Sequence, residues 1–210
     1  MKGAIIDMDG TLVDSMKYWN NKLLEKLDSA NIDYPDNILS LLTPIGVKPS
    51  CEYLHDELGH PKTAEQLYDE IEMEMYADYE SNIGTKPYVM EFLEKLKAQG
   101  VKMCILSAST QSMIEASAKH CGYDKYMEFV MSCEDVGKPK SDPDTYLITA
   151  EKLGVPIEDI TVYDDHLNAL QSAKKAGATV IGVHDISSED DKEEIIELCD
   201  KYIYSFSELL

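Results

Sequence analysis

The chain has 210 residues, 44% of them hydrophobic, which is enough to bury an ordinary core in one domain or in a domain with an insertion. Its 40 acidic residues outnumber 19 basic ones, and the formal charge of −21 opposes binding to nucleic acid or to an anionic membrane surface. The 5 cysteines are scattered without a C-x-x-C pair, and no apolar run approaches the roughly 20 residues of a membrane span. We therefore expect a cytoplasmic, monomeric protein with reduced thiols and with no nucleic-acid or membrane partner.

Short apolar runs are typical of buried parallel strands, and they recur along the chain with helical patterns between them. Apolar residues at helical spacing, followed by a glycine, predict helices over residues 89–96 and 146–153. This alternation predicts an α/β fold with a Rossmann-like parallel sheet. The predicted strands are residues 2–8, 101–106, 129–131, 160–163 and 179–183.

The stretch 15–83 differs from the rest, because it has few strand-like runs and shows helical periodicity instead. The apolar residues with this spacing are Trp19, Leu23 and Leu27, followed by Ala64, Leu67, Tyr68, Ile71 and Met75. Acidic residues on the other side of the second helix are interpreted as its solvated face: Glu65, Asp69, Glu70, Glu72 and Asp78. We predict an α/β catalytic core of residues 1–14 and 84–210, with residues 15–83 inserted as an all-α cap over the strand ends.

A paired-acid motif follows the first predicted strand. It reads Asp7-Met8-Asp9-Gly10-Thr11, so two carboxylates lie two residues apart where the strand gives way to a glycine turn. Both can face one site while adjacent backbone N–H groups reach an anion. On its own, the motif is equally compatible with a simple turn or with part of a calcium loop.

Three later features point to the same site, each at or near the end of a predicted strand. They are Ser107-Ala108-Ser109, Lys140 ahead of Pro143-Asp144, and Asp164-Asp165. Open α/β sheets bind ligands at the carboxyl ends of their strands. An acid pair, a hydroxyl, a lysine and a second acid pair are therefore expected to meet there.

With these motifs in order, the sequence resembles the haloacid dehalogenase (HAD) superfamily of phosphohydrolases, in its β-phosphoglucomutase-like phosphatase branch with a helical cap. Residues Asp7 to Ser15, D-M-D-G-T-L-V-D-S, look like the family's first motif nearly letter for letter, and the match covers the whole chain. The resemblance implies a HAD-fold core and a phosphatase that acts on a small phosphorylated metabolite.

The resemblance also implies roles for single residues. Asp7 would attack phosphorus to form an aspartyl-phosphate, and Asp9 would protonate the leaving alcohol and then activate water. Ser107, Ala108 and Lys140 would hold the phosphoryl oxygens.

A magnesium site follows from the same resemblance. Mg²⁺ would be coordinated by the Asp7 carboxylate, the Asp9 backbone carbonyl and the Asp165 carboxylate. Asp164 would not bind the ion itself but would support these ligands. The family's fourth motif commonly reads E-D-S-x-x-G, and here His166 replaces its serine. His166 either contacts substrate or the metal's surroundings, or makes a local structural hydrogen bond.

The lysine motif departs from the common form K-P-x-P-D. Lys138-Pro139 matches its opening dipeptide, whereas Lys140 to Asp144 matches its spacing. We choose Lys140 as the phosphate ligand, because reach to the phosphate depends on position in the loop. Lys138 would then be an exposed lysine.

The residues also indicate which of the family's reactions this chain catalyses. Asp9 points to phosphate esters, because the family's dehalogenases and phosphonatases lack it. A phosphomutase must hold a bisphosphate at both ends with cap arginine and lysine, but the stretch 46–49 offers Lys48 and no arginine, so hydrolysis is favoured. A noncatalytic regulator that binds a phosphorylated ligand would not need Asp7 and Asp9. The leaving group stays open among sugar phosphate, polyol phosphate, phosphoglycolate and nucleotide.

Overall fold

The computed structural model describes residues 1–42 and 46–210, and these form two compact units. The first unit comprises Met1–Asp14 and Ile83–Leu210, and the second comprises Ser15–Asn82. Ile83, which the sequence analysis placed in the insertion, belongs to the first unit. It is fully buried there, and its carbonyl oxygen accepts a hydrogen bond from Cys121 Sγ at 3.3 Å.

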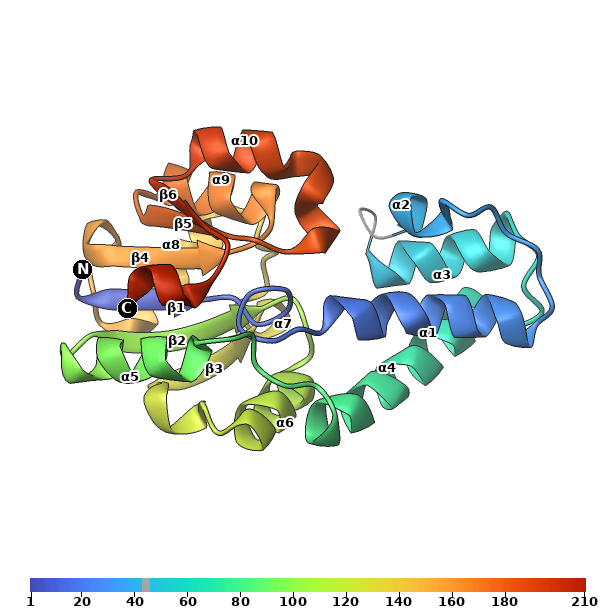
Figure 1. Cartoon of the computed structure of the whole chain (residues 1–210), viewed down its shortest axis with the longest axis horizontal. Helices are drawn as coiled ribbons and strands as arrows, with labels where there is room; N and C mark the ends of the chain where they lie inside the picture. The colour runs from blue at the N-terminus through green and yellow to red at the C-terminus, as the bar shows by residue number, and fades with distance from the viewer. Residues whose placement is uncertain (43–45) are drawn as a thin grey trace. The chain divides into compact units, whose positions relative to one another are not determined.

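The first unit is built on a six-stranded sheet in the order β3-β2-β1-β4-β5-β6, with every neighbouring pair parallel (Figure 1). This confirms the predicted parallel sheet. The strands are β1 (Gly3–Ile6), β2 (Lys102–Ser107), β3 (Phe129–Ser132), β4 (Ile160–Asp164), β5 (Thr179–Val183) and β6 (Lys201–Ile203). The sequence analysis missed β6, because this edge strand has only three residues and buries only Ile203 completely.

Helices cover both faces of this sheet (Figure 1). On one face, Tyr146 and Leu170 belong to the same buried cluster as Ile5 and Val162 of the central strands. On the other, Phe92 packs against Tyr163, with ring centroids 5.1 Å apart. The helices are α5 (Val89–Ala98), α6 (Gln111–Cys121), α7 (Cys133–Val136), α8 (Pro143–Leu153), α9 (Leu167–Ala176) and α10 (Lys192–Leu198), with 3₁₀ turns η2 (Asp124–Tyr126), η3 (Ile157–Asp159), η4 (Ile186–Asp191) and η5 (Phe206–Leu209).

The register of the sheet determines where the polar residues lie. Ile6 of β1 pairs with Ile105 of β2 and with Tyr163 of β4, so the residues that follow these strands leave the sheet at the same edge. Asp7 directly follows β1, and Ser107 and Asp164 are the last residues of β2 and β4. The carboxyl edge of the sheet therefore gathers Asp7, Ser107 and Asp164.

All the regular secondary structure in the described residues of the second unit is helical. Its helices are α1 (Met16–Ser29), α2 (Ile38–Leu42), α3 (Val47–Asp56) and α4 (Ala64–Ser81). The longest of them, α4, begins with a capping box, in which Thr63 and Gln66 satisfy each other's backbone N–H groups. Among the described residues, none of the helices has both the length and the apolar character needed to cross a bilayer.

Lysines of α1 pair with the acidic side of α4. Lys26 Nζ lies 2.5 Å from Glu74 and 3.4 Å from Glu70, and Lys22 Nζ lies 3.3 Å from Asp78. The interpretation of this side as a solvated face is therefore wrong for Asp78, whose side chain is 13% exposed, whereas the Glu70 side chain stays 34% exposed. Helical periodicity does not reveal that a neighbouring helix supplies lysines at those positions.

The backbone of Tyr88, just before α5, adopts a left-handed conformation with φ of 65°, which a side chain with a Cβ disfavours. The tyrosine is 50% exposed, so little packing depends on its ring. We expect Tyr88→Gly to unfold at a higher urea concentration than Tyr88→Ala, by a difference of about 1 kcal/mol in the free energy of unfolding. Both variants lack the ring and differ only in the Cβ. Equal stabilities would contradict the strain.

Candidate active site

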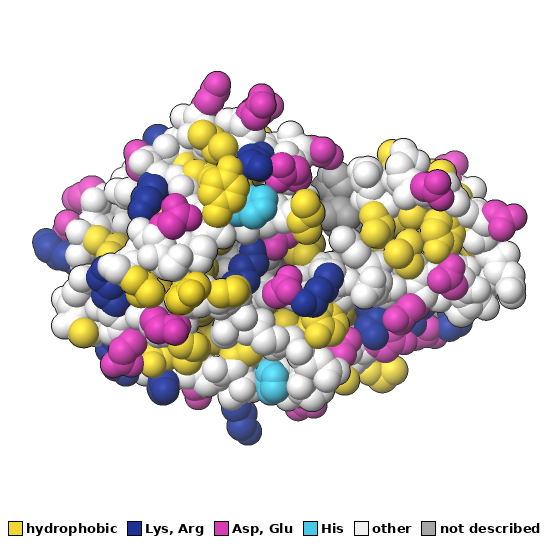
Figure 2. All heavy atoms as spheres, in the orientation of Figure 1, with side chains coloured by type: hydrophobic (Ala, Val, Ile, Leu, Met, Phe, Trp, Pro, Cys, Tyr) yellow, Lys and Arg dark blue, Asp and Glu magenta, His cyan; other side chains and the backbone are white. Residues whose placement is uncertain are grey.

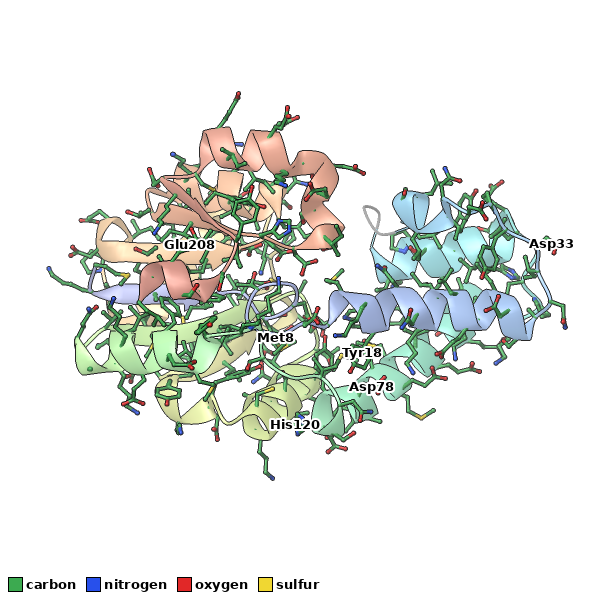
Figure 3. All side chains as sticks on the ribbon, in the orientation of Figure 1. Met8, Tyr18, Asp33, Asp78, His120 and Glu208 are labelled. Atoms are coloured by element: carbon green, nitrogen blue, oxygen red, sulfur yellow. The ribbon has the colours of Figure 1, made fainter. Side chains whose placement is uncertain are left out.

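The first motif forms a closed loop at the carboxyl end of β1. The Asp7 backbone N–H donates to the Tyr163 carbonyl at 2.9 Å, which continues the β1–β4 ladder by one residue. The Leu12 and Val13 N–H groups then both donate to the Met8 carbonyl, at 2.9 and 3.0 Å. Met8 is fully buried and marks this loop in Figure 3. The loop holds Asp7 at the sheet edge, where the residue is only 6% exposed.

Gly10 is required in this loop for two separate reasons. Its φ is 74°, in the left-handed region that favours glycine. A Cβ built on it would also lie 2.6 Å from Asp165 Oδ2. The glycine of the first motif therefore permits the second acid pair to approach the first.

Lys140 lies among the carboxylates. Its Nζ forms an ion pair with Asp7 and donates to Asp164 Oδ2 at 2.8 Å. Burial acts to lower the pKa of Lys140, but the charges of Asp164 and Asp7 raise it well above its ordinary value. The ammonium therefore stays protonated and neutralises part of the cluster.

Lys138 faces a different pair of acids. Its Nζ donates to Asp142 at 2.6 Å and to Asp144 at 2.8 Å, outside the carboxylate cluster. Of the two lysines that the sequence offered, the structure brings Lys140 to Asp7 and leaves Lys138 in surface ion pairs.

Asp7, Asp164 and Asp165 each offer a carboxylate oxygen within 4.8 Å of the others, and all three residues are buried. Burial raises the pKa of Asp7 well above its ordinary value, with Lys140 opposing this shift. Burial and the charge of Asp164 likewise raise the pKa of Asp165 to about 7. When the three carboxylates and the Lys140 ammonium are all ionised, these four groups together carry two excess negative charges. A hard divalent cation with oxygen ligands fits this donor set.

Two hydroxyls orient Asp165. Thr11 Oγ1 donates to its Oδ1 at 3.0 Å, and Ser188 Oγ donates to its Oδ2 at 3.4 Å. Ser188 lies in the turn after β5, which a Lys86–Asp185 ion pair of 2.8 Å anchors. The sequence analysis named Thr11 in the first motif without giving it a role, and it missed Lys86, Asp185 and Ser188, although Asp185 follows a predicted strand end, as the other acids do.

Two serines lie at the carboxyl end of β2, Ser107 and Ser109. Ser107 is 1% exposed, and its Oγ accepts a hydrogen bond from the Ser109 N–H at 3.1 Å. The hydroxyls of Ser107 and Ser109 both donate to Asp9 Oδ2, at 3.4 and 2.7 Å. Ala108, between them, is exposed. The structure thus places Ser107 beside the second aspartate of the first motif, together with Ser109, to which the sequence analysis gave no role.

His166 contributes through its backbone. Its N–H donates to Asp164 Oδ1 at 2.9 Å, while its side chain is exposed before α9. Asp164 thus uses one oxygen for this N–H and the other for Lys140. Chemically, the site combines a buried carboxylate, a lysine, hydroxyl donors and a cation-binding acid cluster, which suits a reaction on an anionic, phosphate-like group.

The chain is similar in sequence to proteins named as phosphatases. The chain is 23% identical over 198 residues to the phosphorylated carbohydrates phosphatase of Thermotoga maritima, covering 94% of this chain and 91% of that protein. It is 26% identical over 183 residues to phosphoglycolate phosphatase 1 of Pseudomonas aeruginosa, covering 83% of this chain and 66% of that protein.

Solved structures share the fold. A HAD hydrolase, family IA, variant 3, from Entamoeba histolytica superposes with a TM-score of 0.85 at 22% identity, covering 100% of this chain and 96% of that one. CbbY from Rhodobacter sphaeroides, solved in complex with phosphate, superposes with a TM-score of 0.82 at 22% identity and the same coverage. The family model for haloacid dehalogenase-like hydrolases matches residues 4–183. The resemblance of the sequence motifs is thereby confirmed, and the chain belongs to the haloacid dehalogenase-like hydrolases.

Proposed function

We propose that this chain is a magnesium-dependent phosphoric monoester hydrolase that works through an aspartyl-phosphate on Asp7 and acts on a small phosphorylated metabolite. The observation that carries the proposal is the position of Lys140, whose ammonium lies between Asp7 and Asp164 at the carboxyl edge of the sheet. A carboxylate nucleophile and a phosphate monoester repel each other, so phosphoryl transfer to Asp7 needs positive charge at that point.

Asp7 attacks phosphorus, and the bond from phosphorus to the leaving oxygen breaks as the aspartyl bond forms. Lys140 and the Ser107 hydroxyl donate to the phosphoryl oxygens, with Ala108 contributing its backbone beside them. Asp9, two residues after the nucleophile, gives a proton to the departing alkoxide. It then takes a proton from the water that cleaves the aspartyl-phosphate.

The Asp7 and Asp165 carboxylates and the Asp9 carbonyl would hold Mg²⁺, and Asp164 would fix Lys140 and the turn before α9. When bound, the ion supplies charge that stabilises the transferring phosphoryl group and orients it. The hydroxyls of Thr11 and Ser188, which hold Asp165, keep that ligand in a single orientation.

The substrate is a small phosphorylated metabolite, as the names of the two phosphatase relatives suggest. We also propose that residues 15–82 act as a cap that selects it. A phosphomutase reaction, which moves a phosphoryl group between two positions of a sugar, is not favoured. The chain contains no arginine that could bind the second phosphate of a bisphosphate through two hydrogen bonds. A panel of phosphorylated metabolites assayed with Mg²⁺ identifies the substrate.

The nucleophile is tested by Asp7→Asn, which keeps the shape of the side chain but removes its charge. We expect hydrolysis of p-nitrophenyl phosphate to fall below detection, because an amide cannot form the aspartyl-phosphate. The matched control is Asp159→Asn, at the opposite end of the strands, where the side chain pairs with Lys2. Near-normal activity of folded Asp7→Asn would exclude the covalent mechanism.

Removal of the metal should affect both activity and stability. We expect EDTA to abolish hydrolysis and added Mg²⁺ to restore it. At 100 times its dissociation constant, Mg²⁺ should raise the free energy of unfolding by about 2.7 kcal/mol, since it binds the folded state alone. Thermal melts of the wild type and of Asp165→Asn measure this without an assay. Equal stabilisation of both proteins would remove Asp165 from the metal site.

The two lysines can be separated by paired alanine substitutions. Lys140→Ala should lower turnover by about 10²–10³-fold, because a buried charge that supports the transition state is lost. Lys138→Ala should change turnover far less, since its ion pairs to Asp142 and Asp144 lie apart from the cluster. Steady-state kinetics, with folding checked by circular dichroism, decide between them, and the reverse ranking would assign the phosphate to Lys138.

A further inference from the structure

The Asp9 carboxylate has a strong hydrogen-bond donor that the roles above leave unused. Ser109 Oγ donates to Asp9 Oδ2 at 2.7 Å, a distance typical of a hydroxyl bonded to a charged acceptor, whereas Ser107 Oγ lies at 3.4 Å from the same atom. We propose that Ser109 is the residue that positions Asp9 for proton transfer. This inference rests on the proposed function and extends it to a further residue.

Ser109 can do this because its own backbone is fixed on both sides. Its N–H donates to Ser107 Oγ at 3.1 Å, which ties it to the end of β2. Its carbonyl accepts from Ser132 Oγ at 2.8 Å, which ties it to the end of β3. The hydroxyl therefore projects from a loop held between two adjacent strand ends.

Further hydrogen bonds fix the position of Ser132 at the end of β3. Gln111, the first residue of α6, accepts from the Ser132 N–H at 3.1 Å and donates to the Val130 carbonyl at 3.3 Å. Its amide thus pairs with the backbone of β3, which is an edge strand of the sheet formed by the described residues. Gln111, Ser132 and Ser109 form a continuous series of hydrogen bonds that ends on Asp9.

A fixed Asp9 matters because proton transfer depends on the distance and direction of the reacting oxygen. A hydrogen bond donated to Oδ2 restricts the rotation of the carboxyl group and favours Oδ1 as the oxygen that carries the proton. Ser107 cannot serve this purpose during the reaction if its hydroxyl turns to the phosphoryl group. Ser109 has no such second role and can continue to hold the acid through its 2.7 Å hydrogen bond.

The basicity of the leaving group provides the test. A strongly basic leaving oxygen needs protonation from Asp9, whereas p-nitrophenolate departs with little help. We expect Ser109→Ala to lower kcat/KM for phenyl phosphate about tenfold more than for p-nitrophenyl phosphate, and Ser109→Thr to restore most of the loss. Asp9→Asn serves as the reference and should show the same dependence more strongly. The ratio kcat/KM is used because it reports the step that expels the leaving group.

Two further serine variants provide the comparison. Ser107→Ala should lower kcat/KM equally for both esters, because a phosphate-holding hydroxyl does not sense the leaving group, and Ser112→Ala, an exposed residue of α6, should lower neither. Equal losses for both esters in Ser109→Ala, no loss, or a gain in activity would overturn the positioning role while leaving the phosphatase intact. If the wild type hydrolyses neither ester nor any metabolite of the panel, the proposed function falls, and this inference with it.

Discussion

The contact between Lys140 and the carboxylates at the carboxyl edge of the sheet is the interaction on which the rest of the site depends. Asp7, Asp164 and Asp165 are each at most 6% exposed, and like charges buried this close would repel strongly. One ammonium, which forms ion pairs with Asp7 and Asp164, lowers that cost. A residual negative charge stays in place, and it makes the cluster suitable for a divalent cation.

The sheet brings these groups together through its register. Because β1 lies between β2 and β4, the nucleophile candidate has the serine strand on one side and the second acid pair on the other. Gly10 then allows the first loop to pass close to Asp165. Packing of apolar side chains on both faces holds the strand ends at this spacing, so core stability and site geometry are linked.

The candidate site lies in an unusually acidic chain. Acidic side chains are spread over the visible surface of each unit (Figure 2), and the formal charge is −21. Long-range attraction of a phosphate ester is therefore unfavourable, and binding depends on local groups. The chain has no arginine, and hydroxyls take a large share of the polar contacts: Thr11 and Ser188 on Asp165, and Ser107 and Ser109 on Asp9.

The sequence by itself determined the features that depend on neighbouring residues. Apolar runs predicted five of the six strands, and the motifs at their ends predicted which side chains meet at the carboxyl edge. Both follow from local patterns, since a buried parallel strand needs a continuous apolar run and its end offers a polar site.

Only the tertiary structure decided features that depend on residues far apart in the chain. Lys138 and Lys140 are two residues apart and have the same side chain. The conformation of their loop places Lys138 beside Asp142 and Lys140 beside Asp7. The Lys86–Asp185 pair joins residues 99 positions apart by their numbers, and no periodicity connects them. Hydrogen bonds and ion pairs of this kind depend on distances in space, which a linear pattern of residue types does not contain.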